Sequence, residues 1–168
     1  GADTPKTISD NLHFTRTLEE CGLTAQVIYT KSPEKITERI TATYGQLHQK
    51  ADKLKVSLSP NRKYLRALYS GGTLCYESQV IWQEILKEPV FSNAPLDKQN
   101  QLPNSNLSQG HTAVDLGEEE FTLGRPHPMI DNELRIQRMA QEAANPQTAV
   151  ILLDVVMPQM DGFEVCRR

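Results

Sequence analysis

The sequence predicts an α/β fold in which helices flank a parallel β-sheet. The prediction rests on strand-like and helix-like segments that alternate over residues 58–168. It also rests on residues 148–155, a nearly unbroken aliphatic run that is typical of a strand buried on both faces. Right-handed crossovers make such strands parallel, and ligands bind at the carboxyl ends of the strands.

The strands predicted in this part of the chain are short apolar runs that end at turn residues. Residues 89–110 are rich in Asn, Gln, Ser and Pro and lack periodicity, so we expect an exposed connection there. Asp131 is placed to cap the last long helix, which Asn145-Pro146 ends. The predicted strands are 64–69, 111–116 and 148–155, and the predicted helices are 74–87 and 132–144.

Residues 1–57 have weaker patterns and are treated as a separate region. They predict a helix over 8–21 that a glycine stops, followed by a short strand over 25–29. Ser32 is the predicted N-cap of a second helix, which runs to about Ala51. A polar joint over 53–61 then leads into the second region.

Composition excludes several classes of protein. The net charge of −3 offers no basic field for nucleic acid or an anionic membrane. No apolar run approaches the roughly 20 residues of a membrane span, and the polar first residues hold no signal-peptide core. The three cysteines lack metal-ligand spacing, so we expect a reduced, cytoplasmic protein without a metal site.

The chain lacks an initiator Met and ends on Arg167-Arg168 soon after a predicted strand. We therefore expect a fragment of a longer protein, with an incomplete sheet.

The last stretch, VILLDVVMPQMDGFEV, resembles the phosphoacceptor strand and loop of a two-component receiver domain, with Asp154 as the acceptor. A receiver also needs an acidic pair on an earlier strand to hold magnesium, and Gln109-Gly110 stand in that region. The signature Lys of that family would lie beyond Arg168. Phosphoryl transfer to Asp154 thus lacks electrostatic support, and a regulatory receiver is an alternative hypothesis.

Three longer stretches resemble the FdrA family, bacterial relatives of succinyl-CoA synthetase that are described as acyl-CoA synthetase-like. The most specific piece is GRPHPMID at 124–131. The family is associated with allantoin breakdown and with carbamoyl transfer to or from oxamate. The three stretches are LYSGGTLCYES at 68–78, GHTAVDLGEEEFTLGRPHPMIDNELRIQRM at 110–139 and NPQTAVILLDVV at 145–156.

This resemblance implies a flavodoxin-like sheet of the CoA-ligase type over residues 58–168. Residues 1–57 would be the tail of an upstream Rossmann-like CoA-binding region, or a helical extension. The resemblance implies a fragment of an enzyme that acts on acyl, carbamoyl or phosphoryl groups. Coenzyme A or a nucleotide would serve the full protein, with a small anionic substrate. An isolated chain would be inactive, or would need a partner subunit or a missing domain.

The sequence departs from the family after LLDVV, where MPQMDGFEV replaces a glycine-containing turn. The resemblance therefore does not extend to the turn after the third predicted strand. A non-catalytic assembly domain is a further alternative function.

The turns after the first two strands supply the candidate anion-binding residues. Glycines let the backbone approach an anion, and the free amides of a helix N-terminus favour negative charge. A tight turn with Thr73 as the helix cap is the alternative interpretation. The candidate residues are Ser70, Gly71, Gly72, Thr73, Asp115 and Gly117.

Arg125 and His127 are the candidate catalytic residues, in a loop that flanking prolines stiffen. Arg125 could bind a carboxylate or phosphate through two hydrogen bonds, and His127 could transfer a proton near neutral pH. The alternative is that His127 only braces the loop while Asp131 caps the helix. Cys75, in a helix first turn, is expected to be a packed structural cysteine rather than a nucleophile.

The receiver hypothesis has a direct test. Incubation with acetyl phosphate and magnesium should leave Asp154 unmodified, because no acidic pair is placed to hold the metal. Intact-mass spectrometry measures the outcome, and a gain of one phosphoryl group on Asp154 would support a receiver.

Overall fold

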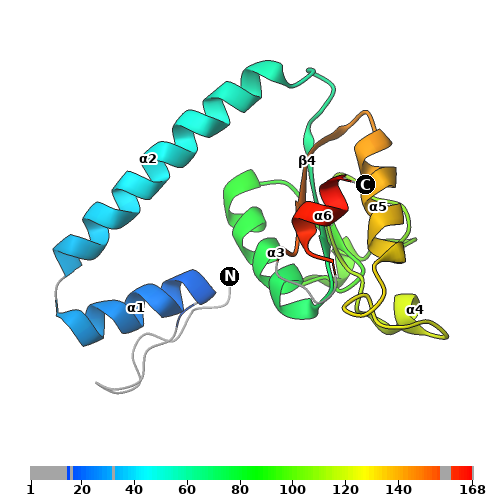
Figure 1. Cartoon of the computed structure of the whole chain (residues 1–168), viewed down its shortest axis with the longest axis horizontal. Coiled ribbons are helices and arrows are strands. Elements are labelled where there is room, and N and C mark those ends of the chain that lie inside the picture. Colours follow the sequence, from blue (N-terminus) through cyan, green and yellow to red (C-terminus); the bar gives the residue numbers. More distant parts are fainter. Residues whose placement is uncertain (1–14, 16, 32, 156–159, 168) are drawn as a thin grey trace. The chain divides into compact units, whose positions relative to one another are not determined.

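The computed structural model describes residues 15, 17–31, 33–155 and 160–167. The chain divides into two compact units, Gly1–Leu58 and Ser59–Arg168. Figure 1 colours the first unit blue to cyan and the second from green to red. Within the described ranges, none of the helices has the length and apolar character needed to cross a bilayer.

The first unit contains two helices, α1 (Leu18–Thr30) and α2 (Pro33–Ser57). Thr17 caps α1, because its hydroxyl oxygen accepts a hydrogen bond from the amide of Glu20 at 3.1 Å. Lys31, in the left-handed conformation with φ of 52°, ends the helix.

The structure contradicts three predictions for this unit, namely the helix stop at Gly22, the strand at 25–29 and the start of the polar joint. The predicted strand at 25–29 is the last part of α1, which passes through Gly22 because one glycine costs a helix only about 1 kcal/mol. A short apolar run does not by itself distinguish strand from helix. Residues 53–57, predicted as a polar joint, form the last turn of α2. Residues 8–14 of the first predicted helix, and the Ser32 cap, lie outside the described residues.

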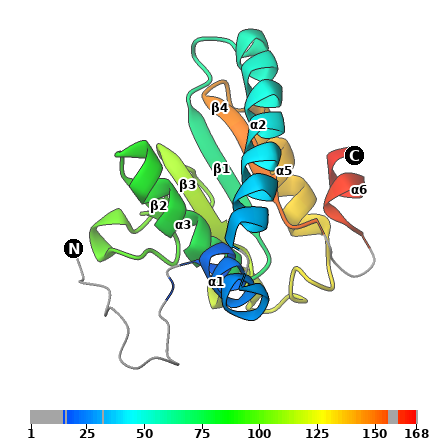
Figure 2. The same ribbon diagram turned by 90° about the vertical axis from the view of Figure 1, so that its left-hand side faces the viewer.

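The second unit is built on a four-stranded sheet with the order β2-β3-β1-β4. Every neighbouring pair of strands is parallel, and Figure 2 shows the four strands side by side. This arrangement confirms the predicted α/β class. The strands are β1 (Tyr64–Tyr69), β2 (Val90–Ser92), β3 (His111–Asp115) and β4 (Thr148–Leu153).

Helices cover both faces of the sheet, with α3 (Gly72–Leu86) and α5 (Glu133–Ala144) on opposite sides in Figure 1. Three shorter helical segments lie in the connections. They are η1 (Lys98–Asn100), α4 (Glu119–Thr122) and α6 (Gly162–Arg167).

Alternate residues of each strand point to opposite faces of the sheet, where they pack into two separate apolar clusters. Leu152 packs in the first cluster and Leu153 in the second, so these neighbours point to opposite faces of the sheet. The buried members of the first cluster are Ala67, Tyr69, Cys75, Trp82, Val90 and Ala113. Those of the second are Leu68, Leu102, Val114, Leu116 and Phe121.

The prediction of an exposed connection over 89–110 is wrong in its first half. The segment opens with β2, which pairs with β3. It then returns along β2, where the amide of Leu102 donates to the Ser92 carbonyl at 2.9 Å. Val90 and Leu102 are both buried. Three residues are too few to give a strand signal, and only pairing with a neighbouring strand reveals this one.

The prediction that the last strand is buried on both faces is also wrong in part. β4 is an edge strand that ends at Leu153, and Val150 is 44% exposed. An aliphatic run shows that a strand packs in a core, but it does not show whether the strand has a second neighbour.

A buried ion cluster joins α5 to the sheet. Glu142 of α5 accepts hydrogen bonds from Arg66 Nε of β1 at 3.1 Å and from the Thr148 hydroxyl of β4 at 3.2 Å. The Ser108 hydroxyl donates to the other carboxylate oxygen, and Arg138 lies 3.8 Å from that oxygen. The cluster therefore fixes the position of α5 relative to β1, β4 and the loop before β3.

Replacing Leu153 with alanine should lower the free energy of unfolding by about 2–3 kcal/mol, near the low end for leucine truncations, because the side chain is only partly buried. Val150→Ala, on the same strand, should cost less than about 1 kcal/mol. Urea denaturation measures both, and equal losses would show that Leu153 is not in a core.

Candidate functional site

The carboxyl ends of β1, β3 and β4 meet at one edge of the sheet, because the strands are parallel. The amide of Leu116 donates to the Tyr69 carbonyl at 2.7 Å. The amide of Ser70 donates to Oδ2 of Asp154 at 2.6 Å. The turns that follow these strands therefore lie against one another, at the edge where the sequence predicted a site.

The predicted glycine turn joins β1 to α3. Gly71 occupies the N-cap position and no side chain caps the helix, so the structure contradicts the interpretation of Thr73 as the cap. Thr73 lies instead in the first turn and is exposed. A Cβ on Gly72 would lie 3.2 Å from Oδ2 of Asp115, so the glycine lets that carboxylate approach the turn.

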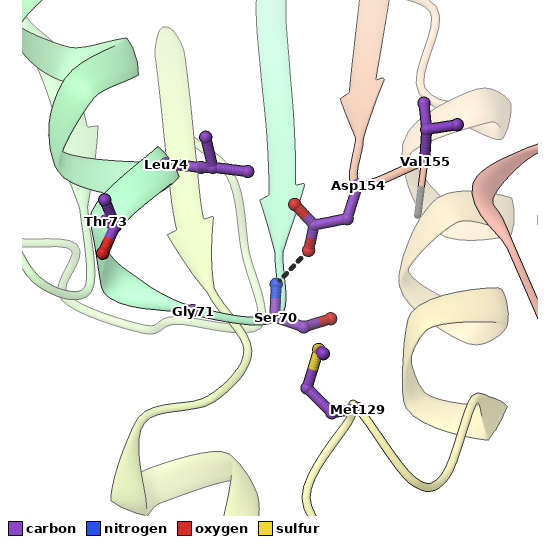
Figure 3. A pocket seen from close by; sticks show the side chains of 7 residues that line it. All are labelled: Ser70, Gly71, Thr73, Leu74, Met129, Asp154 and Val155. Atoms are coloured by element: carbon purple, nitrogen blue, oxygen red, sulfur yellow. Dashed lines mark hydrogen bonds between the residues drawn. The ribbon is translucent and has the colours of Figure 1, made fainter. Parts of the chain in front are cut away.

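A hollow of about 440 Å³ lies beside the turn. Figure 3 shows Asp154 bonded to Ser70, with Met129 reaching towards the same place from the loop before α5. Leu74, Met129 and Val155 supply apolar wall, whereas the turn and Asp154 supply polar groups. The hollow suits a small ligand with a polar head and a short apolar part. Its lining residues are Ser70, Gly71, Thr73, Leu74, Met129, Asp154 and Val155.

His127 and Asp115 approach each other at this edge of the sheet. A Cβ on Gly117 would lie 2.8 Å from Nε2 of His127 and 3.1 Å from Oδ1 of Asp115. Both side chains therefore border the space that Gly117 leaves open. The amide of Met129 donates to Nδ1 of His127 at 3.1 Å, so a neutral ring carries its hydrogen on Nε2.

Burial sets the protonation of Asp115. It raises the pKa of the carboxyl group, and the nearby Asp154 raises it further. The amide of Gly117, which donates to Oδ1 at 2.8 Å, and the imidazole of His127 lower the pKa. A buried carboxyl group with a perturbed pKa beside a histidine is an arrangement that proton transfer uses.

The two arginines of this region lie in different places. Arg125 is exposed and lines a second hollow, formed with Asp131 and Glu133 among others. Arg135 of α5 is fully buried, and its guanidinium lies 3.4 Å from the Ser70 hydroxyl. The structure thus brings His127, but not Arg125, beside Gly117 at the carboxyl edge of the sheet.

Sequence reasoning missed Arg135 and the wall residue Met129. A signal for Arg135 exists in retrospect. Arg135, Arg138 and Glu142 recur at spacings of three and four, which places all three charges on one face of a helix. All three are buried, and a striped charge pattern of this kind also occurs on solvated helices, so the spacing alone does not decide between them.

Other sequence candidates do not line the hollow beside the glycine turn. His111 begins β3, at the opposite edge of the sheet, and its Nδ1 accepts a hydrogen bond from the amide of Leu65. Burial raises the pKa of the Cys75 thiol to about 11, which suits a packed cysteine rather than a nucleophile. Glu118–Glu120 are exposed, and Glu120 accepts a hydrogen bond from the Ser105 hydroxyl.

Asp154 has a bonding role at the end of β4, since its Oδ2 holds the Ser70 amide. Across the ranges that the structure describes, no group of three or more His, Cys, Asp or Glu side chains is placed to hold a metal ion.

Two comparisons with known proteins bear on this site. The sequence model of a family described as CoA-ligase matches residues 68–161. The match runs from β1 past β4, so it includes most of the stretch that resembles a receiver. The uncharacterized protein YahF of Escherichia coli (strain K12) is 42% identical over 104 residues, which cover 62% of this chain and 20% of YahF. The chain thus spans about a fifth of the length of that curated relative.

Asp115→Asn should raise the melting temperature at neutral pH. The folded-state pKa of Asp115 lies above its unfolded value, so the folded protein binds the proton more tightly. Its ionised form therefore destabilises the fold increasingly as pH rises through the folded-state pKa. Asparagine removes that cost and can still accept the hydrogen bond from Gly117.

Thermal unfolding of the two proteins at a series of pH values measures the effect. The advantage of the asparagine variant should shrink as pH falls below the folded-state pKa. A variant that is less stable at every pH by a constant amount would contradict this account of Asp115.

Proposed function

The chain belongs to the CoA-ligase family, and we propose that it handles an acyl, carbamoyl or phosphoryl group at the carboxyl edge of its sheet. The observation that carries the proposal is the hollow against the first turn of α3, with Asp115 and His127 at the same edge. Because the chain spans a fifth of YahF, the complete reaction is assigned to a larger protein.

In this proposal the first turn of α3 binds a negatively charged oxygen of the substrate. The Ser70 amide is already engaged by Asp154, so the substrate oxygen is placed towards the amides of Gly71, Gly72 and Thr73. The Thr73 hydroxyl is a further donor. The carboxylate of Asp154 repels an anion on its own side of the hollow, which favours the same orientation.

His127 is the proposed hydrogen-bond donor to the reacting oxygen, and Asp115 lies at the same edge of the sheet. The bond from Met129 fixes Nδ1 as an acceptor, so Nε2 is the atom that can donate to a leaving oxygen. A ring held in this tautomer stabilises negative charge on that oxygen through a hydrogen bond and keeps its own proton. Asp115, whose pKa burial raises, is the proposed proton carrier.

Coenzyme A, when bound, would supply the thiol that carries the acyl group. The hollow fits a small acyl or thioester end, because its wall contains Leu74, Met129 and Val155. Among the described residues that line it there is no lysine or arginine, so we assign the nucleotide phosphates to other parts of the larger protein. We accordingly propose that turnover needs a partner subunit or a further domain.

The resemblance to the FdrA family adds carbamoyl compounds and oxamate to the candidate substrates, with a role in allantoin breakdown. Oxamate pairs a carboxylate with an amide in a very small molecule. Such a molecule suits a hollow that offers backbone donors on one side and a carboxylate acceptor on the other.

NMR titration of the full chain tests the binding step. Acetyl phosphate, carbamoyl phosphate, oxamate and acetyl-CoA would be added separately, and at least one should shift the amide signals of Gly71, Gly72 and Thr73. Thr73→Val keeps the shape of the side chain but removes a donor to a charged oxygen, so affinity should fall about tenfold.

Arg125→Lys is the matched control, because Arg125 lines the other hollow. The affinity of this variant for each ligand should equal that of the unmodified chain. A lower affinity of Arg125→Lys would show that Arg125 contacts the anion, since lysine lacks the planar fork of arginine. Shifts confined to residues away from the turn would contradict the proposed site.

A further inference from the structure

We propose that Asn93 is a positioning residue that fixes Asp115 beside His127, and that the loop after β2 is therefore part of the site. The inference rests on the proposed function of the Asp115–His127 pair. Its test, however, uses no ligand.

The side-chain amide of Asn93 bonds both backbone groups of Asp115. Nδ2 donates to the Asp115 carbonyl at 2.8 Å, and Oδ1 accepts from the Asp115 amide at 2.9 Å. A side-chain amide offers a donor and an acceptor in one plane, so it can replace the backbone of a neighbouring strand. Strand pairing between β2 and β3 ends at Ser92 and Ala113, and Asn93 extends the bonding to Asp115.

The loop that presents Asn93 is itself anchored. Gln79 of α3 is fully buried, donates to the Ala94 carbonyl at 3.1 Å and accepts from the amide of Leu96 at 3.2 Å. The side chain of Gln101 donates to the Asn93 carbonyl at 3.0 Å. The helix that begins at the glycine turn therefore also holds the loop that holds Asp115.

This arrangement matters because Asp115 is the last residue of β3. A terminal residue without a neighbour on that side would bond water and could turn its side chain away. The Gly117 amide fixes one carboxylate oxygen, and Asn93 fixes the backbone from which the side chain leaves. The titratable groups that face the carboxylate are His127, Asp154 of the β4 end and Cys75 of α3.

The experiment is a double-mutant cycle that reads the pKa of the Asp115 carboxyl group by ¹³C NMR of the full chain. His127→Ala should raise that pKa, because the imidazole lowers it. The same change in an Asn93→Ala background should raise it by about half as much or less, since the carboxylate is no longer held beside residue 127.

Asn61→Ala, in an exposed turn before β1, is the matched control and should leave the full rise in place. A rise in the Asn93→Ala background equal to that of the unmodified chain would overturn the proposal. Should Asn93→Ala fail to fold, Asn93→Ser repeats the cycle with a smaller polar side chain. If neither variant folds, Asn93 supports the fold rather than the site, and the proposal is likewise overturned.

A failed ligand titration alongside a diminished rise would reject the proposed function while leaving the positioning role of Asn93 intact. Ligand binding at the turn, together with a full rise of the Asp115 pKa in the Asn93→Ala background, would support the proposed function and reject the positioning role of Asn93.

Discussion

The arrangement of the second unit depends on the hydrogen bonds and the ion pair that the buried carboxylate of Glu142 makes. This carboxylate bonds Arg66 of β1 and Thr148 of β4 from α5, with both charged side chains almost wholly out of water. Removing one member of such a group leaves an uncompensated buried charge, which usually costs about 3–5 kcal/mol. Because its partners lie on two strands, the cluster also fixes where α5 crosses the sheet.

That placement has consequences at the other end of α5. The helix begins just after the loop that carries His127 and Met129, and Arg135 in its first turns reaches the Ser70 hydroxyl. The position of the loop over the glycine turn thus follows from the packing of the helix behind it. A site of this kind is held by rigid elements, which is what precise placement of reactive groups needs.

The electrostatics of the site are a balance between acidic side chains and backbone donors. Asp115 and Asp154 both lie at the edge where an anion would bind, and Asp154 already takes the Ser70 amide. Arg135 offsets part of the negative charge of Asp154. In the proposed site, this balance favours an anionic ligand on the Gly71–Thr73 side. Burial of Asp115 without a full counter-charge costs stability, as is common where function sets the residue.

The sequence by itself determined the α/β class, the strands β1, β3 and β4 and the helices α3 and α5, because period and capping are local properties. It also indicated the glycine turn and His127 as site residues, although their roles stay predictions. Only the tertiary structure decided that β2 exists, that β4 is an edge strand, and that Arg135 rather than Arg125 lies beside Ser70. Strand order and the reach of a side chain across a helix face depend on contacts between residues far apart in the chain, which no local pattern encodes.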